Sequence, residues 1–366
     1  MPLALGRTRW SPIPPDERAA LPGGEQAPPP APPSALLDAG AHRAAASDNL
    51  ADRCRTFLPS SLQRLLQAAA ETGDAAGVRV FAVGGFVRDL LLGVRDADLD
   101  LTVEGDGVAF ARRLGAAIGG VSKGPSAFGT VVVVAPGGQK IDVATARRET
   151  YTHPAALPTV TPGTIRDDLW RRDFSINTLA FPLHGPGAFT LLDWYGGRAD
   201  LSAGIIRVLH DASFRDDPTR IFRAIRLEQR FGFTLQAHTG CLLRRAVEQR
   251  WIERLSGARL WRELRLMLES ESAGRCLARL QALEALSQVD AALRLGAEGL
   301  AVLTGATAAR ADLTAVAPEV GTRPWFACLA ALLSGLTPEE IRRICRRLAL
   351  SARVTQALSA GLAAVE

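Results

Sequence analysis

The sequence predicts an α/β domain with a small mixed sheet, followed by a region that is helical almost to its end. Strand-like apolar runs alternate with helical runs between about residues 61 and 144. The last two strand-like runs are joined only by the turn PGGQ, which is too short for a crossover helix and therefore predicts an antiparallel pair. After about Asp211, apolar residues recur at spacings of three and four, as in amphipathic helices.

The chain has 366 residues, of which 47% are apolar and 22% charged, so it is long enough for two or three packed domains. Residues 1–55 carry 10 of the 22 prolines and have almost no periodic apolar pattern, so we expect this segment to be disordered. The expected elements then follow in order: helix 62–70, strand 78–83, helix 86–92, strand 98–103, helix 108–118, strand 130–135 and strand 140–144. Thr337, Pro338 and Glu340 predict a late helix start, with a Thr cap, Pro at the first position and Glu in the first turn. We expect a disordered segment (1–55), an α/β domain (56–205) and two helical regions (206–265 and 266–366).

The composition argues against a membrane-spanning or secreted protein and against a disulfide or zinc site. No apolar run reaches the roughly 18 residues that span a bilayer, and Arg7 and Arg9 interrupt the start before a signal-peptide core forms. We therefore expect a soluble, cytoplasmic protein without a membrane partner. The cysteines lie far apart, with no CxxC and no His at metal-ligand spacing, which predicts mostly buried thiols rather than disulfides or a zinc site; they are Cys54, Cys241, Cys276, Cys328 and Cys345.

Arginine is unevenly distributed along the chain. Lys123 and Lys140 are the only lysines, so the other 41 of the 43 basic residues are arginine, and the count alone says little about function. Residues 215–265, however, contain 12 arginines and 6 acidic residues, a local charge of +6 against +5 for the whole chain. This concentration favours an anionic partner such as nucleic acid, and a solvated helix face is the alternative.

A glycine pair lies between an expected strand and an expected helix. Gly84 and Gly85 would let the backbone approach a ligand closely, and the following helix N-terminus would direct free N–H groups at a phosphate. The third glycine of the dinucleotide fingerprint GxGxxG is missing. The alternative is a tight turn without a ligand.

Three aspartates predict a divalent-cation site. Asp98 and Asp100 are two residues apart on an expected strand, so their side chains share one face, about 7 Å apart. Asp142 lies in the middle of another apolar strand, where an unpaired charge is costly unless a cation or partner receives it. Such carboxylates can hold two divalent cations and support nucleotidyl transfer. Turn capping or pairing with arginines is the alternative.

Two arginine-rich segments complete the candidate site. Arg171 and Arg172 could bind phosphate, and Asp173 and Asn177, four residues apart, are expected on one helix face where they could contact sugar hydroxyls. A surface arginine pair is the alternative.

The second segment carries Asp217, Arg220, Arg223, Arg226 and Arg230, which fall on one face of an expected helix. An Asp acceptor beside an Arg donor complements the amino group and bare ring nitrogen of cytosine and adenine, and opposes uracil and guanine. A capped helix with a solvated arginine face is the alternative.

These motifs run in order from about Val80 to Phe233: GGFVRD with LLLG and DLD, then IDVATAR, DLWRRDFSIN, DWYGGRADL and DDPTRIFRAIR. In this order they resemble the class II tRNA nucleotidyltransferase and bacterial poly(A) polymerase family, within the DNA polymerase beta superfamily. The resemblance implies a nucleotidyltransferase head over residues 56–205, a base-recognising helical neck over 206–265, and a helical body and tail that bind tRNA over 266–366.

The resemblance also implies roles for individual residues. Asp98, Asp100 and Asp142 would be the catalytic, Mg²⁺-binding carboxylates, and Asp217 with Arg220 would read the base. The nucleotide-binding set implied by the motifs is Gly84, Gly85, Arg88, Arg172, Asp173, Asn177, Asp217, Arg220, Arg223 and Arg226.

We therefore expect addition of C and/or A from CTP and ATP to the tRNA 3′ end, with release of pyrophosphate. The family's base-reading motif usually begins Glu-Asp, whereas here it is Asp216-Asp217, and residues 149–158 replace the Asp-Gly-Arg loop of many full CCA-adding enzymes. CCA addition, A addition alone and CC addition alone therefore stay open. So do a poly(A) polymerase and a non-catalytic RNA-binding protein on the same fold, although keeping three carboxylates without cations would be unfavourable. The sequence leaves the oligomeric state open.

Overall fold

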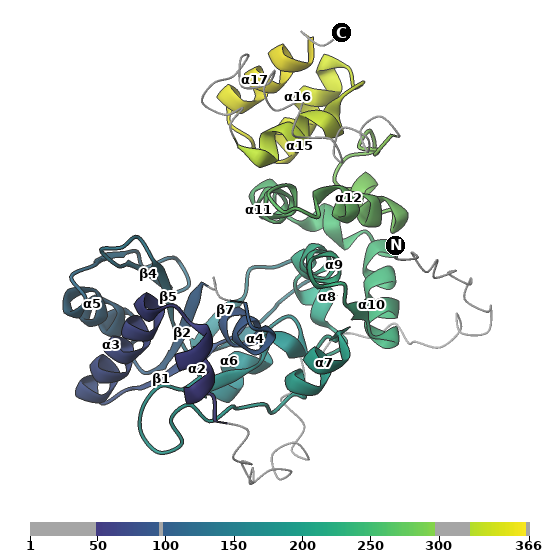
Figure 1. The fold of residues 1–366 in the computed structure, drawn as a ribbon. Coiled ribbons are helices and arrows are strands. Elements are labelled where there is room, and N and C mark those ends of the chain that lie inside the picture. The colour runs from purple at the N-terminus through teal and green to yellow at the C-terminus, as the bar shows by residue number, and fades with distance from the viewer. Residues whose placement is uncertain (1–48, 95–97, 297–322, 364–366) are drawn as a thin grey trace, which may run out of the picture.

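A six-stranded sheet with the order β3-β4-β5-β2-β1-β8 underlies the first part of the protein (Figure 1). The computed structural model describes residues 49–94, 98–296 and 323–363. β2 and β5 pair in parallel and all other neighbours in this sheet are antiparallel, so the expected mixed sheet and the antiparallel pairing of β4 with β5 are confirmed. The strands are β1 (Arg79–Val83), β2 (Leu99–Glu104), β3 (Val121–Lys123), β4 (Val131–Val134), β5 (Lys140–Thr145) and β8 (Ala180–Pro182).

Helices surround this sheet and then form the rest of the described chain. Around the sheet lie α2 (Ala51–Phe57), α3 (Ser60–Ala76), α4 (Gly85–Leu92), α5 (Gly107–Ala117), α6 (Ile165–Trp170), the 3-10 turn η3 (Ser175–Asn177) and α7 (Gly197–Ala203). Next come α8 (Ser213–Asp216), α9 (Thr219–Phe231), α10 (Ala237–Glu248), η4 (Trp251–Arg254), α11 (Gly257–Leu268), α12 (Ala273–Ala282) and η5 (Leu286–Gln288). The last helices are α15 (Pro324–Leu333), α16 (Pro338–Arg347) and α17 (Ala352–Ala363).

Two short strand pairs were not expected from the sequence. The hairpin of β6 (Arg147–Thr150) and β7 (Thr159–Pro162) follows β5, and β9 (Ile205–Ile206) pairs in parallel with β10 (Thr234–Leu235). Both β7 residues with apolar side chains are exposed, so no buried alternation marks this strand in the sequence.

The two faces of the sheet have different surroundings. Side chains alternate along β2 and β5, so Leu99 and Ile141 are buried in the main core, where α3 and α5 contribute Leu66 and Leu114. On the opposite face, α6 packs over β1 and β8 through a smaller apolar cluster. Asp100 and Asp142 occupy the alternate positions of β2 and β5 and line a cleft instead.

The folded part begins earlier than the expected boundary at residue 55. Leu50, Cys54 and Leu58 recur at helical spacing and are buried in the main core, and the Asn49 side chain accepts a hydrogen bond from the Ala51 N–H. These contacts make α2 part of the fold, so the expectation that residues 49–55 are disordered is wrong. Residues 1–48 lie outside the described residues.

The helical part continues the same apolar core. α9 packs against α11 and α12, and α11 packs against α15, so the main core runs from Leu50 to Leu358 (Figure 1). Phe231, the last residue of α9, lies against both Arg88 of α4 and Arg230, with ring-to-guanidinium distances of 5.0 and 4.7 Å. This ring joins the helical part to the α/β part beside the cleft.

Three smaller expectations can be compared with the structure. The predicted helix start at Thr337 is confirmed by a capping box with Glu340 and by Pro338 at the first helical position. All five cysteines are free thiols and all but Cys241 are buried. Across residues 49–94, 98–296 and 323–363, no helix has the length and apolarity to cross a membrane.

We predict that the turn after β1 tolerates only glycine. Gly84 has φ 67° and ψ −127°, and an added Cβ would collide with the Arg172 guanidinium. Gly84→Ala should therefore lower the free energy of unfolding by about 1–3 kcal/mol from the backbone, with a further loss from displacing Arg172. Urea unfolding checks this. Gly77→Ala is the matched control, because Gly77 also has positive φ but nothing lies within 4 Å of its added Cβ, so about 1 kcal/mol is expected. Equal losses would contradict the close approach of Arg172.

Candidate active site

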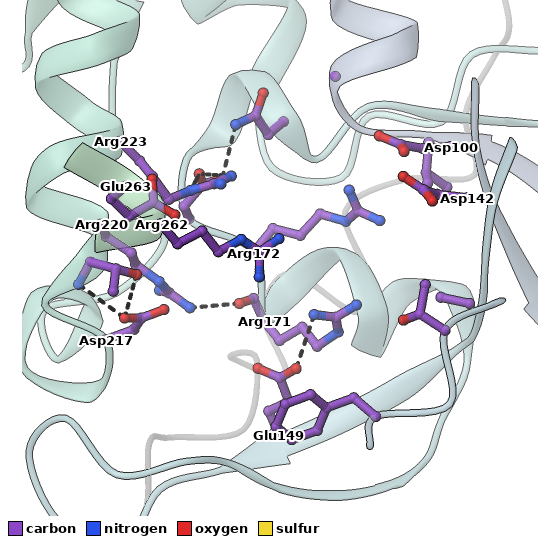
Figure 2. Close-up of a pocket in the computed structure, with 18 of the residues that line it drawn as sticks. Asp100, Asp142, Glu149, Arg171, Arg172, Asp217, Arg220, Arg223, Arg262 and Glu263 are labelled. Carbon is purple, nitrogen blue, oxygen red and sulfur yellow. Dashed lines mark hydrogen bonds and ion pairs between the residues drawn. The ribbon is translucent and has the colours of Figure 1, made fainter. Parts of the chain in front are cut away.

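A cleft of about 710 Å³ lies between the open face of the sheet and the helices α9 and α11. Figure 2 shows carboxylates on the strands to one side and a group of arginines on the helical side. Apart from Gly84, every site residue predicted from the sequence lines this cleft. The structure therefore brings together motifs that are up to about 140 residues apart in the chain.

The two carboxylates on the cleft floor are adjacent because of strand register. β2 and β5 are parallel neighbours, and Asp100 pairs with Asp142, so both side chains point to the same face (Figure 2). Asp98 lies one residue before β2 rather than on it, and its exposed side chain also lines the cleft. The expected alternation along one strand thus describes Asp100, while Asp98 is at the entrance of that strand.

Burial and like charge disfavour ionisation of this pair. The pKa of Asp100 is raised to about 6 by burial and by the charges of Asp142 and Asp98, although Arg172 and Arg88 act in the opposite direction. The pKa of Asp142 is raised by burial and by Asp98, against Lys140 and Arg262. No described residue donates a hydrogen bond to these carboxylates. An unpaired anionic pair of this kind favours a cation.

The residues fit a magnesium ion chemically. Hard carboxylate oxygens are its preferred protein ligands, and Mg²⁺ takes only one or two carboxylates and completes its shell with water and substrate phosphates. Within the part of the chain that the structure describes, no group of three or more His, Cys, Asp or Glu side chains is arranged to hold a metal. A pair with phosphate as co-ligand is therefore the arrangement that these residues support.

The turn at Gly84 and Gly85 brings the backbone and the guanidinium groups of Arg88 and Arg172 close to the floor of the cleft. Gly84 precedes α4 and its N–H donates to the Leu179 carbonyl at 2.9 Å. An added Cβ on Gly85 would lie 3.6 Å from Arg88 Nη2 and 3.9 Å from Asp100 Oδ2. The turn, the α4 N-terminus and Asp100 therefore border the same space, which a phosphate chain can enter.

The adjacent arginines have different partners. Buried Asp168 accepts from Arg171 Nη2 at 2.7 Å and from Arg172 Nη2 at 3.0 Å. Arg171 also donates to Glu149 at 3.0 Å, so it is held away from the carboxylate pair (Figure 2). Arg172 lies against Gly84 and is the largest charge acting against the raised pKa of Asp100. Of the two, only Arg172 is placed to meet a phosphate beside Asp100.

The expectation that Asp173 and Asn177 share a helix face is wrong. Phe174 is extended and only residues 175–177 form a 3-10 turn, yet the turn still brings Asn177 Nδ2 to 2.9 Å from Asp173 Oδ1. Asn177 Oδ1 accepts from Arg88 Nη1 at 2.6 Å, and Asp173 Oδ2 accepts from Arg223. Burial alone would raise the pKa of Asp173, but Arg223 and Asn177 hold it well below its usual range. Asp173 therefore holds Arg223 directly and Arg88 through Asn177.

Asp217 is not on a helix face with Arg220, contrary to expectation. It is extended, with φ −137°, because α9 begins only at Thr219, and its carboxylate accepts a hydrogen bond from the first N–H of that helix. Oδ1 accepts from Thr219 N at 3.0 Å, Thr219 Oγ1 at 2.6 Å and Arg259 Nη2 at 2.7 Å. Oδ2 makes no hydrogen bond within the described chain. One acceptor oxygen is thus fixed and the other is available beside the cleft.

The arginines of α9 are also anchored. Arg220 Nη1 donates to Ser213 Oγ at 2.6 Å and Nη2 donates to the Arg171 carbonyl at 2.7 Å, while each nitrogen keeps a second N–H. Arg226 is 3.8 Å from Glu263 and Arg230 is 3.4 Å from Asp89. The four arginines expected on one helix face all line the cleft. Their protein partners were not indicated by the sequence.

Sequence reasoning missed five titratable residues of the cleft, which come from two parts of the chain. Glu149 and Tyr151 come from the β6 end of the unexpected hairpin, and the Tyr151 hydroxyl donates to Glu149 at 2.7 Å. Arg259, Arg262 and Glu263 come from α11. Their spacing of three and four marks one helix face, but the sequence gives no signal that this face meets the distant sheet.

Arg259 joins the loop after the β6 strand to the helical part. Its Nη1 donates to the Ala155 carbonyl at 2.7 Å while its Nη2 holds Asp217 Oδ1. The Ala155 N–H donates to the Arg215 carbonyl at 3.1 Å. The loop, α8 and α11 therefore meet at Asp217.

Comparisons with known proteins identify the family of the chain. Residues 80–207 match the poly A polymerase head domain. The A-adding tRNA nucleotidyltransferase of Geobacter sulfurreducens is 42% identical over 296 residues, which cover 80% of this chain but only 33% of that protein. The CC-adding enzyme of Deinococcus radiodurans is 36% identical over 267 residues, covering 69% of this chain and 70% of that protein.

A solved structure is similar over a comparable length. The Thermotoga maritima CCA-adding enzyme complexed with tRNA superposes with a TM-score of 0.66 at 31% identity, covering 85% of this chain and 72% of that one. The predicted fold class, a nucleotidyltransferase head of the DNA polymerase beta type followed by an all-α region, is confirmed. With its head-domain match and its relatives among A-adding, CC-adding and CCA-adding enzymes, the chain belongs to the tRNA nucleotidyltransferase family.

Proposed function

We propose that this protein is a template-independent nucleotidyltransferase that adds C and/or A from CTP and ATP to the tRNA 3′ end and releases pyrophosphate. The observation that carries the proposal is the unpaired Asp100–Asp142 pair, which faces the arginines of α9 across one cleft (Figure 2). The names of the relatives support the substrates, and the related Thermotoga enzyme was solved with tRNA. A cytoplasmic location stays a prediction.

In this reaction the tRNA 3′ oxygen forms a bond to the α-phosphorus of the nucleotide, and the bond to the pyrophosphate oxygen breaks. Asp100 and Asp142 would hold Mg²⁺ together with the substrate phosphates, and Asp98 would add its negative charge from the entrance of β2. The ion, when bound, would make the hydroxyl more acidic and neutralise the charge on the phosphates. Arg172 and the α4 N-terminus would bind the triphosphate beside Asp100. Arg88 and Asn177, which are hydrogen-bonded to each other, would orient the sugar and phosphates from the same side.

Asp217 and Arg220 would select the base through complementary hydrogen bonds. Asp217 Oδ2 is the free acceptor for the exocyclic amine of A or C, and the remaining N–H groups of Arg220 are donors for the bare ring nitrogen. Asp173 and Arg223 hold each other and keep this part of the cleft in place. Arg226 would contribute positive charge near the base or sugar.

Among CCA, CC-only and A-only addition, the similarity to relatives favours an activity that includes the terminal A. The A-adding Geobacter relative is more similar than the CC-adding Deinococcus relative, at 42% against 36% identity. We therefore propose addition of the terminal A as part of the activity, with full CCA addition as the wider possibility.

We predict a short, defined extension of tRNA. Transcripts lacking one, two or three terminal nucleotides are incubated with ATP and CTP, singly and together, and the products are sequenced. A single A on tRNA ending in CC is the expected minimum. Extension by CC alone would exclude A addition, a long A tail on any RNA would identify a poly(A) polymerase, and no extension would indicate a non-catalytic RNA-binding protein.

We predict that Asp100→Asn and Asp142→Asn each lower kcat/KM by about 10³-fold or more, because several kcal/mol of charge stabilisation are lost. Folding should persist, as checked by circular dichroism and thermal unfolding. The control is Glu271→Gln, which changes an exposed carboxylate away from the cleft and should keep full activity. Appreciable turnover by Asp100→Asn would place the active centre elsewhere.

The same variant tests the raised pKa of Asp100. A carboxyl whose pKa rises to about 6 on folding destabilises the fold when ionised, so its penalty is absent below about pH 4 and complete above about pH 6. In EDTA, the wild type should lose on the order of 2 kcal/mol more stability over this range than Asp100→Asn does. Identical pH profiles of the two proteins would contradict the assignment.

We predict that Asp217→Asn changes base selection. The side-chain oxygen should stay with Thr219 and Arg259, so the new NH₂ group replaces Oδ2 at the base. Recognition of A and C should weaken by about 1–3 kcal/mol, or roughly 5- to 150-fold in kcat/KM, while UTP and GTP gain relatively. Measuring kcat/KM for all four nucleotides decides this. Asp211→Asn, an exposed carboxylate paired with His238, is the control. An equal decrease for all four would show that Asp217 does not read the base.

A further inference from the structure

α11 contributes three charged side chains to the cleft, and they differ in their partners. Arg259 is held by Asp217 and the Ala155 carbonyl, and Glu263 is buried next to Arg226. Arg262 is exposed and extends into the cleft from the helical side (Figure 2). Every other arginine lining the cleft is hydrogen-bonded or ion-paired to another described residue. Over the described ranges, Arg262 has no such partner.

The cleft floor has two sides with different neighbours. Asp100 on β2 faces the glycine turn, and the arginines whose charges act on it are Arg172 and Arg88. Asp142 lies one strand farther from that turn, on β5, and the cations whose charges act on it are Lys140 and Arg262. A triphosphate on the glycine turn would occupy the Asp100 side. The Asp142 side is then left for the other reactant.

The other reactant is an RNA end, and its last phosphodiester enters the cleft with the 3′ hydroxyl. A guanidinium with all five N–H groups unused by protein binds a phosphate strongly through bidentate hydrogen bonds. We propose that Arg262 binds a backbone phosphate at the 3′ end of the RNA substrate, on the Asp142 side of the cleft; this inference rests on the proposed nucleotidyltransferase function.

The test compares Arg262→Ala and Arg262→Lys with the matched control Arg265→Ala. Arg265 lies on the same helix, but its half-exposed side chain pairs with Glu269 and does not line the cleft. The measurements are the Kd for tRNA ending in CC, by filter binding at several salt concentrations, and the KM for ATP and CTP.

Arg262→Ala should weaken tRNA binding about tenfold and reduce the slope of log K against log salt by about 1, with the nucleotide KM changed less than twofold. Arg262→Lys should recover part of the affinity and the salt slope, and Arg265→Ala should match the wild type. A raised nucleotide KM with unchanged tRNA affinity would move Arg262 to the triphosphate side and overturn the proposal. So would an Arg262→Ala variant that binds tRNA like the control.

The two proposals can fail separately. If the wild type binds tRNA but adds no nucleotide, the proposed function fails while the affinities and salt slopes still decide the role of Arg262. If the wild type adds nucleotides and Arg262→Ala has normal tRNA affinity, only the inference fails. Absence of any tRNA binding by the wild type would overturn both.

Discussion

The repulsion between Asp100 and Asp142 is the constraint around which the site is arranged. A nearby arginine could remove it by pairing with either carboxylate, but over the described residues every arginine lining the cleft except Arg262 is held by other protein groups. Asp168 binds Arg171 and Arg172, and Asp173 binds Arg223. Burial would raise the pKa of Asp168, yet its two arginine partners keep it below the usual range and so keep it charged. These outer acids hold positive charge close to the pair without neutralising it, so the pair remains available to a cation.

Most of the arginines that line the cleft come from the helical part of the chain. α9 and α11 pack on each other in the main core and carry arginines toward the sheet, while Phe231 sits against Arg88 of α4. The geometry of the cleft therefore depends on the packing of the helical part against the α/β part. A loss of apolar packing between α9 and α11 would displace the arginines that these helices contribute to the cleft, while Asp100 and Asp142 stayed in place on the sheet.

Local patterns predicted from the sequence agree best with the structure where a few neighbouring residues decide the geometry. The β4–β5 hairpin follows from a short turn, and the Thr337 helix start follows from its cap. The Asp100–Asp142 contact depends on the register of strands that are distant in sequence, which no local pattern determines. Counting helical angles from Asp217 predicts a place on the helix face, but α9 begins only at Thr219 and Asp217 is an extended residue that accepts from its first N–H. Arg262 was missed because an exposed arginine on an amphipathic helix looks the same whether it faces solvent or a cleft.

Arg259 contacts the Ala155 carbonyl with one nitrogen and Asp217 with another, so a single planar group links the loop after β6 to the residue two positions before the start of α9. The guanidinium is rigid, and moving either anchor turns the other. The length of the loop is thereby linked to the orientation of Asp217, although the two are about 60 residues apart. With Asp217 in the base-reading role proposed above, an insertion or deletion in this loop would change nucleotide choice before it changed stability. Divergence of selectivity within such a fold can therefore begin in a surface loop while the helix that carries the arginines stays the same.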